Sequence, residues 1–205
     1  MNKYLYALAC LLALCFTSCS ESDEESTEYA NWQARNDTYF AAIYQRATDS
    51  ISAGSKNWHI YKALTKSQTE KGAITDYIVA NVISEGNSST ATPLQTDSVR
   101  VFYEGRLIPS DSYPEGKVFD CTWNGEYNVK TMVPTQFAVA SSSIVTGFTT
   151  ALQYMHVGDR WKVYIPYQLG YNAKAQSAVP AYSTLIFDLT LHSFWRNGYT
   201  SPSFK

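Results

Sequence analysis

Three stretches of the chain alternate between apolar and polar residues, namely VRVFYEG, RWKVYIP and TLIFDLTLHSF. A period of two places every second side chain on the same face of an extended strand. The apolar residues that share a face within each stretch are Val99, Val101 and Tyr103; Trp161, Val163 and Ile165; and Leu185, Phe187, Leu189 and Leu191. Because the opposite faces are polar, we expect these segments to be half-buried strands of an antiparallel sheet.

Other segments fill in the rest of the predicted fold. WHIYKAL and DYIVANVIS also read as strands, whereas TKSQTEKG and EGNSSTATPLQTDS read as polar connections. In TGFTTALQYMHVG, apolar residues recur at i, i+3, i+4 and i+7, at Phe148, Ala151, Leu152 and Met155. This spacing predicts one short helix that packs on one curved sheet.

A longer amphipathic helix is expected from Glu28 to about Ala47. Its apolar stripe is formed by Trp32, Tyr39, Phe40, Ile43, Tyr44 and Ala47. Two partners for this stripe are considered, the helix's own domain and the same helix of a second copy, which would make a homodimer. Because the helix lies outside the family resemblance described below, we expect it to be dispensable for the pocket.

The N-terminus reads as a targeting segment. Residues 1–18 combine Lys3 with an apolar run from Tyr4 to Phe16 that is too short to span a bilayer stably. FTSC, ending at Cys19, resembles a bacterial lipobox, which predicts a lipoprotein signal peptide (1–18), lipidation of Cys19 and a membrane attachment. Residues 19–27 contain the acidic run SESDEES and are expected to form a tether, which resembles a surface-export signal of Bacteroidetes lipoproteins. The alternative is a plain secretory peptide followed by an acidic spacer.

Composition excludes several kinds of function. The formal net charge is −2 and no basic block occurs, so nucleic acid is not an expected partner. His59, His156 and His192 lack the spacing of metal ligands, and neither a metal nor a cofactor is predicted. Cys121 is the only cysteine outside the first nineteen residues, so an intramolecular disulfide is not expected, and a buried role is favoured over a nucleophilic one.

The order of several motifs resembles one known family. VRVFYEGRL, VFDCTW, PTQFAVA, IVTGFTTALQYMHVGDRWKVYIPYQLGY and VPAYSTLIFDLTL resemble the successive signatures of FKBP-type peptidyl-prolyl cis-trans isomerases, over roughly residues 76–194. The resemblance implies an α+β fold in which a twisted antiparallel β-sheet wraps around a short α-helix. The expected organisation is an N-terminal helical extension (28–72), an FKBP-like domain (73–195) and a C-terminal tail (196–205).

The resemblance also implies an aromatic pocket that holds a proline ring and rotates the preceding amide bond. Its catalytic lining would be Tyr103, Phe119, Asp120, Phe137, Ile144, Val145, Phe148, Tyr171 and Phe187, with Val179 covering the mouth and binding substrate. Asp120 stands between apolar neighbours, and Tyr171 is the expected partner of its carboxylate.

Several positions depart from the family pattern. Phe148 stands where tryptophan is usual, Asn172 where glycine is usual, and Cys121 where a small hydroxyl residue is usual. The segments 108–118 and 122–134 are longer than the family's turns, and such loops around the pocket would narrow or block it.

Three functions are compatible with this sequence. The first is a lipid-anchored isomerase in the cell envelope that assists folding of exported, proline-containing polypeptides, attached to the outer membrane and either periplasmic or surface-exposed. The second is a non-catalytic module of the same fold that binds a peptide, a protein partner or a glycan. A glycan would require Trp123 and Tyr127 to be coplanar and exposed. The third is a structural subunit of an outer-membrane complex.

Overall fold

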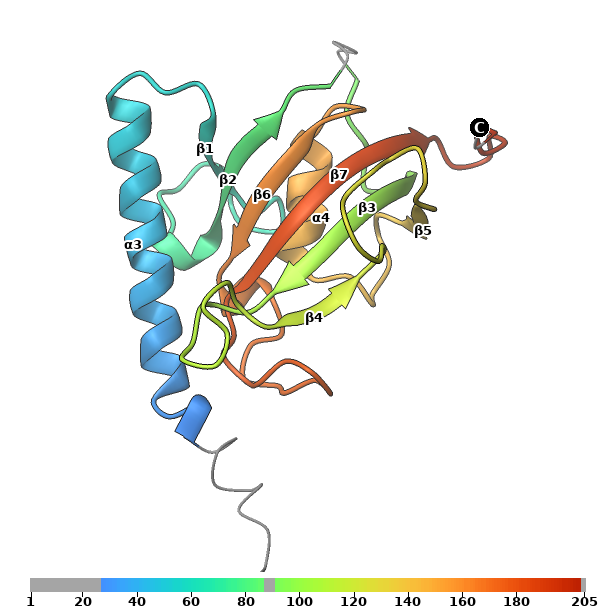
Figure 1. Cartoon of the computed structure of the whole chain (residues 1–205). Helices are drawn as coiled ribbons and strands as arrows, with labels where there is room; N and C mark the ends of the chain where they lie inside the picture. The colour runs from blue at the N-terminus through green and yellow to red at the C-terminus, as the bar shows by residue number, and fades with distance from the viewer. Residues whose placement is uncertain (1–26, 87–90, 204–205) are drawn as a thin grey trace, which may run out of the picture. The chain divides into compact units, whose positions relative to one another are not determined.

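The computed structural model describes residues 27–86 and 91–203 (Figure 1). The predicted signal peptide, Cys19 and all of the acidic tether except Thr27 lie outside these described residues. Within the described ranges, no helix is both long enough and apolar enough to cross a bilayer.

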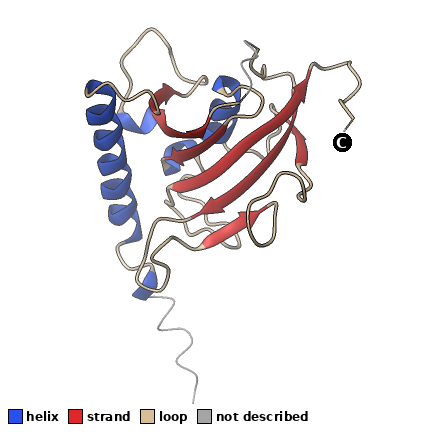
Figure 2. Ribbon diagram, turned by 45° about the horizontal axis from the view of Figure 1, so that its top comes forward, coloured by secondary structure: helices blue, strands red, loops and turns tan. Residues whose placement is uncertain are grey.

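Seven strands of the described chain form one antiparallel sheet (Figure 2). They are β1 (Trp58–Lys62), β2 (Tyr77–Ser84), β3 (Ser98–Arg106), β4 (Val118–Cys121), β5 (Thr135–Ala138), β6 (Arg160–Ile165) and β7 (Leu185–Trp195). Their order is β1-β2-β6-β7-β3-β4, and β5 also pairs with β3. The predicted α+β architecture, a twisted antiparallel sheet with a short helix, is confirmed.

The inner face of the sheet covers α4 (Thr146–Tyr154). The alternating residues of β7 that point to this face, Leu185, Phe187, Leu189 and Leu191, are at most 6% exposed. Phe148, Ala151 and Leu152 of α4 are buried against the sheet, as the helical spacing predicts. We call the opposite side of the sheet, which carries Asp188 and Thr190, the outer face.

Part of the outer face is covered by α3 (Trp32–Ser52), which contacts β1, β2 and β6. The helix buries Trp32, Phe40, Ile43 and Ala47, so its apolar stripe packs on its own domain, the first of the two expected partners. The helix begins four residues later than expected, because Asn31 has a left-handed backbone (φ 52°), and it continues to Ser52.

The segment 28–72 is therefore more than a helical extension. Besides α3 it contributes β1, whose five residues pair in register with Tyr77–Asn81 of β2. On the outer face, Trp58 stacks on Tyr164 of β6, with 6.3 Å between the ring centroids. The described residues from Asn31 onward form one compact unit, so α3 and β1 belong to the same folded body as the rest of the sheet.

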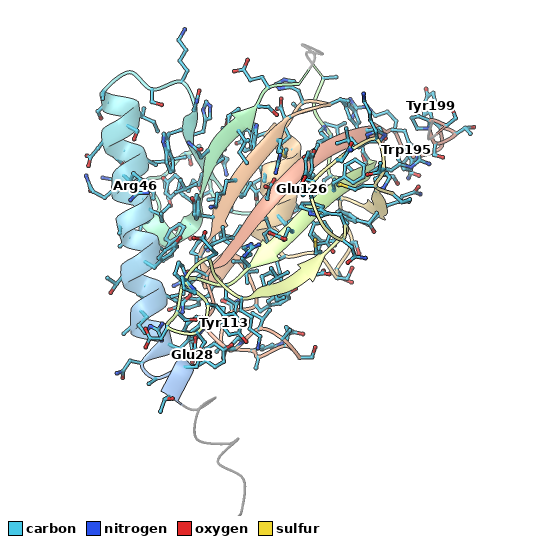
Figure 3. All side chains as sticks on the ribbon, viewed as in Figure 1. Glu28, Arg46, Tyr113, Glu126, Trp195 and Tyr199 are labelled. Carbon is cyan, nitrogen blue, oxygen red and sulfur yellow. The ribbon has the colours of Figure 1, made fainter. Side chains whose placement is uncertain are left out.

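The long connection between β4 and β5 crosses the outer face, in front of β7 and β3 in Figure 1. Tyr127 of this connection shares a hydrogen bond of 2.7 Å with the Thr190 hydroxyl of β7. The guanidinium of Arg160, itself paired with Asp188, lies 3.7 Å from the centroid of the Tyr127 ring. Figure 3 labels Glu126 on this connection, in front of β7. The connection is thus fixed on the side of the sheet opposite to α4.

Candidate active site

A cavity of about 290 Å³ opens beside α4, where β3, β4, β5 and β7 meet. It is lined by twelve residues, Tyr103, Phe119, Asp120, Thr135, Gln136, Phe137, Ser143, Ile144, Val145, Phe148, Tyr171 and Phe187. We call this cavity the cup. All nine residues predicted as its catalytic lining are among the twelve, although they come from positions up to 84 residues apart in the sequence.

The base of the cup is made of two buried rings. Phe148 of α4 is 4% exposed and Phe187 of β7 is 6% exposed. Their centroids lie 4.9 Å apart with their planes at 80°, and Tyr103 meets both rings edge-on. Such perpendicular contacts are a favourable arrangement for aromatic quadrupoles. The rings therefore support one another and present an apolar surface to the opening.

The wall on the β4 side depends on a residue without a side chain. Gly105 of β3 lies opposite Asp120 of β4 and opposite Phe187 of β7. A Cβ at Gly105 would lie 2.5 Å from Phe119 Cζ and 2.8 Å from Phe187 Cε1. The absence of that carbon lets the ring of Phe119 lie over the strand, with its centroid 5.6 Å from that of Phe187.

The carboxylate of Asp120 at the rim is paired with Tyr103. The Tyr103 hydroxyl donates a hydrogen bond of 2.6 Å to Asp120 Oδ2. This corrects the sequence-based expectation that Tyr171 is the partner. The reason is the register of the sheet, because β3 and β4 are adjacent strands whereas Tyr171 lies beyond η2 (Tyr167–Leu169).

Tyr171 reaches the cup from the segment between β6 and β7. Its hydroxyl has no hydrogen-bond partner among the described residues. Burial, followed by the negative charge of Asp120, raises the pKa of Tyr171, so the hydroxyl stays protonated at neutral pH and is available as a donor. Burial also raises the pKa of Tyr103, where the hydrogen bond to Asp120 adds to the effect.

Asn172 follows Tyr171 at the position where the resembling family has glycine. Its φ of 55° lies in the left-handed region. Glycine and asparagine both tolerate this region better than other residues. The substitution therefore preserves the turn that presents Tyr171.

One predicted residue lies outside the cup, and three lining residues were not predicted. Val179 is 4% exposed, forms an isolated bridge with Gln176 and is not among the lining residues. Thr135, Gln136 and Ser143 line the cup without having been singled out. Thr135 lies two residues before Phe137 in PTQFAVA, so the alternation of that strand could have identified it. Gln136 has the opposite parity in the strand, and no pattern in the sequence singles it or Ser143 out.

The two long loops do not obstruct the cup. None of the residues of 108–118 or 122–134 is among its lining. The second loop is held on the outer face by Tyr127, and the first closes on itself through backbone hydrogen bonds between Ser110 and Tyr113. The expectation that these loops narrow the site is therefore wrong for this structure.

The chemistry available in the cup is binding and hydrogen bonding. Among its described lining residues none is a histidine, cysteine or lysine. The thiol of Cys121 lies nearby on β4 but contacts the Trp123 carbonyl oxygen at 3.1 Å, and burial raises its pKa. In the part of the chain that the structure describes, no group of three or more potential metal ligands comes together.

Comparisons with known proteins agree with this site. Residues 89–192 match the FKBP-type peptidyl-prolyl cis-trans isomerase family. The FKBP-type 22 kDa peptidyl-prolyl cis-trans isomerase of Escherichia coli is 36% identical over 111 residues, which cover 54% of this chain and 46% of that protein. The macrophage infectivity potentiator of Trypanosoma cruzi is 28% identical over 199 residues, which cover 96% of this chain and 87% of that protein.

Among solved structures, a peptidyl-prolyl cis-trans isomerase from Pseudomonas syringae aligns over 75% of this chain and 94% of its own, with a TM-score of 0.48 and 22% identity. The chain spans about half the length of the E. coli relative. The family match covers about half of the chain and includes all twelve lining residues of the cup. This chain therefore belongs to the FKBP-type peptidyl-prolyl cis-trans isomerase family.

Proposed function

We propose that this protein is a peptidyl-prolyl cis-trans isomerase that assists the folding of exported proteins. The observation that carries the proposal is the cup itself. Five aromatic side chains, Tyr103, Phe119, Phe137, Phe148 and Phe187, converge on one cavity whose rim holds an unpaired tyrosine hydroxyl. This arrangement suits a flat apolar ring next to a carbonyl group, which is the shape of an Xaa-Pro unit.

Catalysis of this reaction requires no covalent step. Rotation about an amide bond crosses a barrier of about 18–20 kcal/mol, because partial double-bond character is lost when the amide leaves the plane. The twisted amide is less polar at its C–N bond than the planar one, so a site with few waters favours the twisted form relative to bulk water. The buried base of the cup, formed by Phe148 and Phe187, provides that environment.

The polar groups have distinct roles in this mechanism. Tyr171 donates its free hydroxyl to the carbonyl oxygen of the bound peptide and fixes that side of the rotating bond. Asp120 accepts the Tyr103 hydroxyl at 2.6 Å, which holds the Tyr103 ring against Phe148 and Phe187. Tyr103 is thus oriented by its own partner, whereas Tyr171 remains available to the substrate.

The acceleration that the site must provide is modest. Uncatalysed isomerisation takes tens to hundreds of seconds, slow enough to limit folding. Differential binding of about 4 kcal/mol corresponds to roughly a thousandfold acceleration. The proline ring is buried in both the planar and the twisted amide, so its burial contributes to affinity, whereas the acceleration has to come from the site's preference for the less polar twisted amide and from a hydrogen bond that strengthens as the amide twists.

The alternative, binding without catalysis, lacks support in its glycan form. The rings of Trp123 and Tyr127 lie at 79° to each other, whereas a sugar platform needs coplanar rings. Tyr127 is also covered by the guanidinium of Arg160. Binding of a peptide without acceleration remains a distinct outcome of the test below.

The test measures the exchange of a proline peptide by NMR with the full chain and two matched variants. Phe119→Ala removes a half-buried ring of the cup, whereas Phe194→Ala removes a half-buried ring near the far end of β7. We expect wild type and Phe194→Ala to accelerate exchange and Phe119→Ala to lose at least about tenfold in kcat/KM, equivalent to about 1.4 kcal/mol. A wild type that binds the peptide without accelerating exchange would leave only the binding function.

We further propose that the protein is a lipoprotein of the cell envelope, attached through Cys19 to the outer membrane. The lipobox-like FTSC followed by an acidic run supports this. A relative from Legionella longbeachae, 36% identical over 104 residues, is called an outer membrane protein. Labelling of cells with a palmitate analogue should mark wild type and not Cys19→Ala, and equal labelling of both would refute the anchor.

A further inference from the structure

The N-terminal half of α3 is bonded to the segment that carries Tyr171. We call residues 167–184, which run from η2 to the start of β7, the rim segment. Asn36 of α3 is fully buried, and its Oδ1 accepts the backbone N–H of Thr184 at 2.7 Å. Its Nδ2 donates to the carbonyl oxygen of Trp32, also at 2.7 Å. A buried side-chain amide whose oxygen and nitrogen are both hydrogen-bonded holds its partners in one geometry.

Two further contacts connect the same helix to the rim segment. The indole nitrogen of Trp32 donates to the Ser183 hydroxyl at 2.8 Å, and that hydroxyl donates in turn to the carbonyl of Pro180 at 2.7 Å. Gln33 reaches the hydroxyl of Tyr167 at 3.2 Å. The helix α3 therefore contacts the rim segment at both ends of that segment, at Tyr167 and at Ser183 and Thr184.

Between these contacts the rim segment adopts a backbone that needs outside support. Tyr182 has a φ of 62°, a left-handed conformation that a bulky side chain rarely adopts. Such strain persists only where the surroundings fix the chain. The Tyr182 N–H donates to the carbonyl of Asn172 at 2.8 Å, and the Tyr182 ring meets that of Tyr167 edge-on. Asn172 directly follows Tyr171.

We propose that α3 is a brace that positions Tyr171 at the cup, with Asn36 and Trp32 as positioning residues. The connection runs from these two side chains through Ser183 and Thr184 to the strained Tyr182 and from there to Asn172 and Tyr171. The inference rests on the proposed function, because it assigns a role in that function to a helix outside the matched residues 89–192. It reverses the sequence-based expectation that the helix is dispensable for the pocket.

The C-terminal half of α3 provides an internal control. Ile43 is 6% exposed, yet among the described residues no hydrogen bond links this part of the helix to the rim segment. If α3 acted only as a cover for the outer face, substitution of Asn36 and substitution of Ile43 would have the same effect on the cup. If α3 acts as a brace, substitution of Asn36 changes the cup and substitution of Ile43 changes only global stability.

The test is backbone amide hydrogen exchange on the full chain for wild type, Asn36→Ala, Trp32→Phe and Ile43→Ala. Trp32→Phe removes the indole donor and part of the buried ring while leaving Asn36 in place, and it serves if Asn36→Ala fails to fold. Ile43→Ala controls for the loss of buried volume. The informative amides are those of Tyr182 and Asn172, which donate to the carbonyl oxygens of Asn172 and Tyr167 within the rim segment and not to α3. We expect both brace variants to exchange them about tenfold faster relative to Val101 of β3, a change equivalent to about 1.4 kcal/mol.

Two readouts connect this change to the cup. In the brace variants the side-chain resonances of isotopically labelled Tyr171 should shift or broaden, and kcat/KM should fall by about tenfold at temperatures where all variants are folded. The Ile43→Ala variant should match wild type in both the Tyr171 resonances and kcat/KM. Equal effects of Ile43→Ala and Asn36→Ala, or unchanged exchange at Tyr182 and Asn172, would overturn the brace. A wild type that does not accelerate isomerisation refutes the proposed function instead, and the exchange and Tyr171 signals still decide the brace.

Discussion

Addition of one methyl group at Gly105 should damage the cup without removing any of its residues. In Gly105→Ala the new carbon would lie 2.5 Å from Phe119 Cζ, so the ring must move by about 0.9 Å to reach ordinary van der Waals contact at 3.4 Å. Overpacking of this kind costs about 1–3 kcal/mol, and alanine recovers about 0.5–1 kcal/mol of strand stability. We therefore expect the free energy of unfolding to fall by at most about 2.5 kcal/mol.

The effect on activity should be larger than the effect on stability. A misplacement of about 1 Å in a catalytic site can cost on the order of a hundredfold. We expect kcat/KM for a proline peptide, measured by exchange NMR, to fall by about ten- to a hundredfold.

A double-mutant cycle separates this clash from a general weakening of the strand. Phe119→Leu lacks the two ring atoms of Phe119 that the new methyl group would meet, Cζ and Cε2, and leaves only the contact with Phe187. The urea-unfolding cost of Gly105→Ala should therefore shrink by at least about 0.5 kcal/mol in the Phe119→Leu background. Equal costs in the two backgrounds, or unchanged activity of Gly105→Ala, would refute the placement of Phe119.

Three further predictions follow from other parts of the molecule. Phe148→Trp should keep or raise kcat/KM, because the open cup beside Phe148 has room for the larger ring, and a loss beyond about tenfold would show overpacking instead. Burial raises the pKa of Tyr39 and of Tyr61 to about 12, so both stay neutral in the fold while the unfolded chain ionises near pH 10. Their contribution to stability is complete below pH 10 and is lost as the pH rises to 12, which urea unfolding across that window should show. A Tyr39→Phe/Tyr61→Phe variant should lose less stability over the same window but still lose some, because burial also raises the pKa of Tyr103, Tyr164 and Tyr171. A chain starting at Gly72 should lose its cooperative thermal transition, because the large buried side chains of α3 contribute about 1.5–3 kcal/mol each to a total of about 5–15 kcal/mol; retention of that transition would show that the helix is separable.

The cup was predictable from the sequence because its residues lie in regular elements. Phe148 and Phe187 follow helical and alternating patterns, and the family resemblance supplied their common location. The pairing of Asp120 was not predictable in this way. Whether Tyr103 or Tyr171 reaches that carboxylate depends on which strands are neighbours, and this is a property of the sheet rather than of any local pattern.

The hydrogen bonds between α3 and the rim segment were missed for a related reason. The apolar stripe indicated that the helix is amphipathic, but Asn36 lies within this stripe as a polar residue. A polar residue in a buried position indicates a specific partner without naming it. That partner, the Thr184 N–H, is 148 residues away in the sequence. The path of the second long loop, 122–134, was likewise decided by a distant contact, the Tyr127–Thr190 pair, whereas the first loop closes on itself locally between Ser110 and Tyr113.

The central claim is that the cup is the place where the Xaa-Pro bond rotates. It is tested most directly by one NMR titration of the full chain, isotopically labelled in its aromatic rings, with a proline peptide. We expect the resonances of Phe187 and Tyr171 to shift with the same saturation that accelerates cis–trans exchange of the peptide. Shifted resonances without faster exchange of the peptide would show that the cup binds the peptide but does not catalyse its isomerisation. Faster exchange without shifted resonances of Phe187 and Tyr171 would contradict the account.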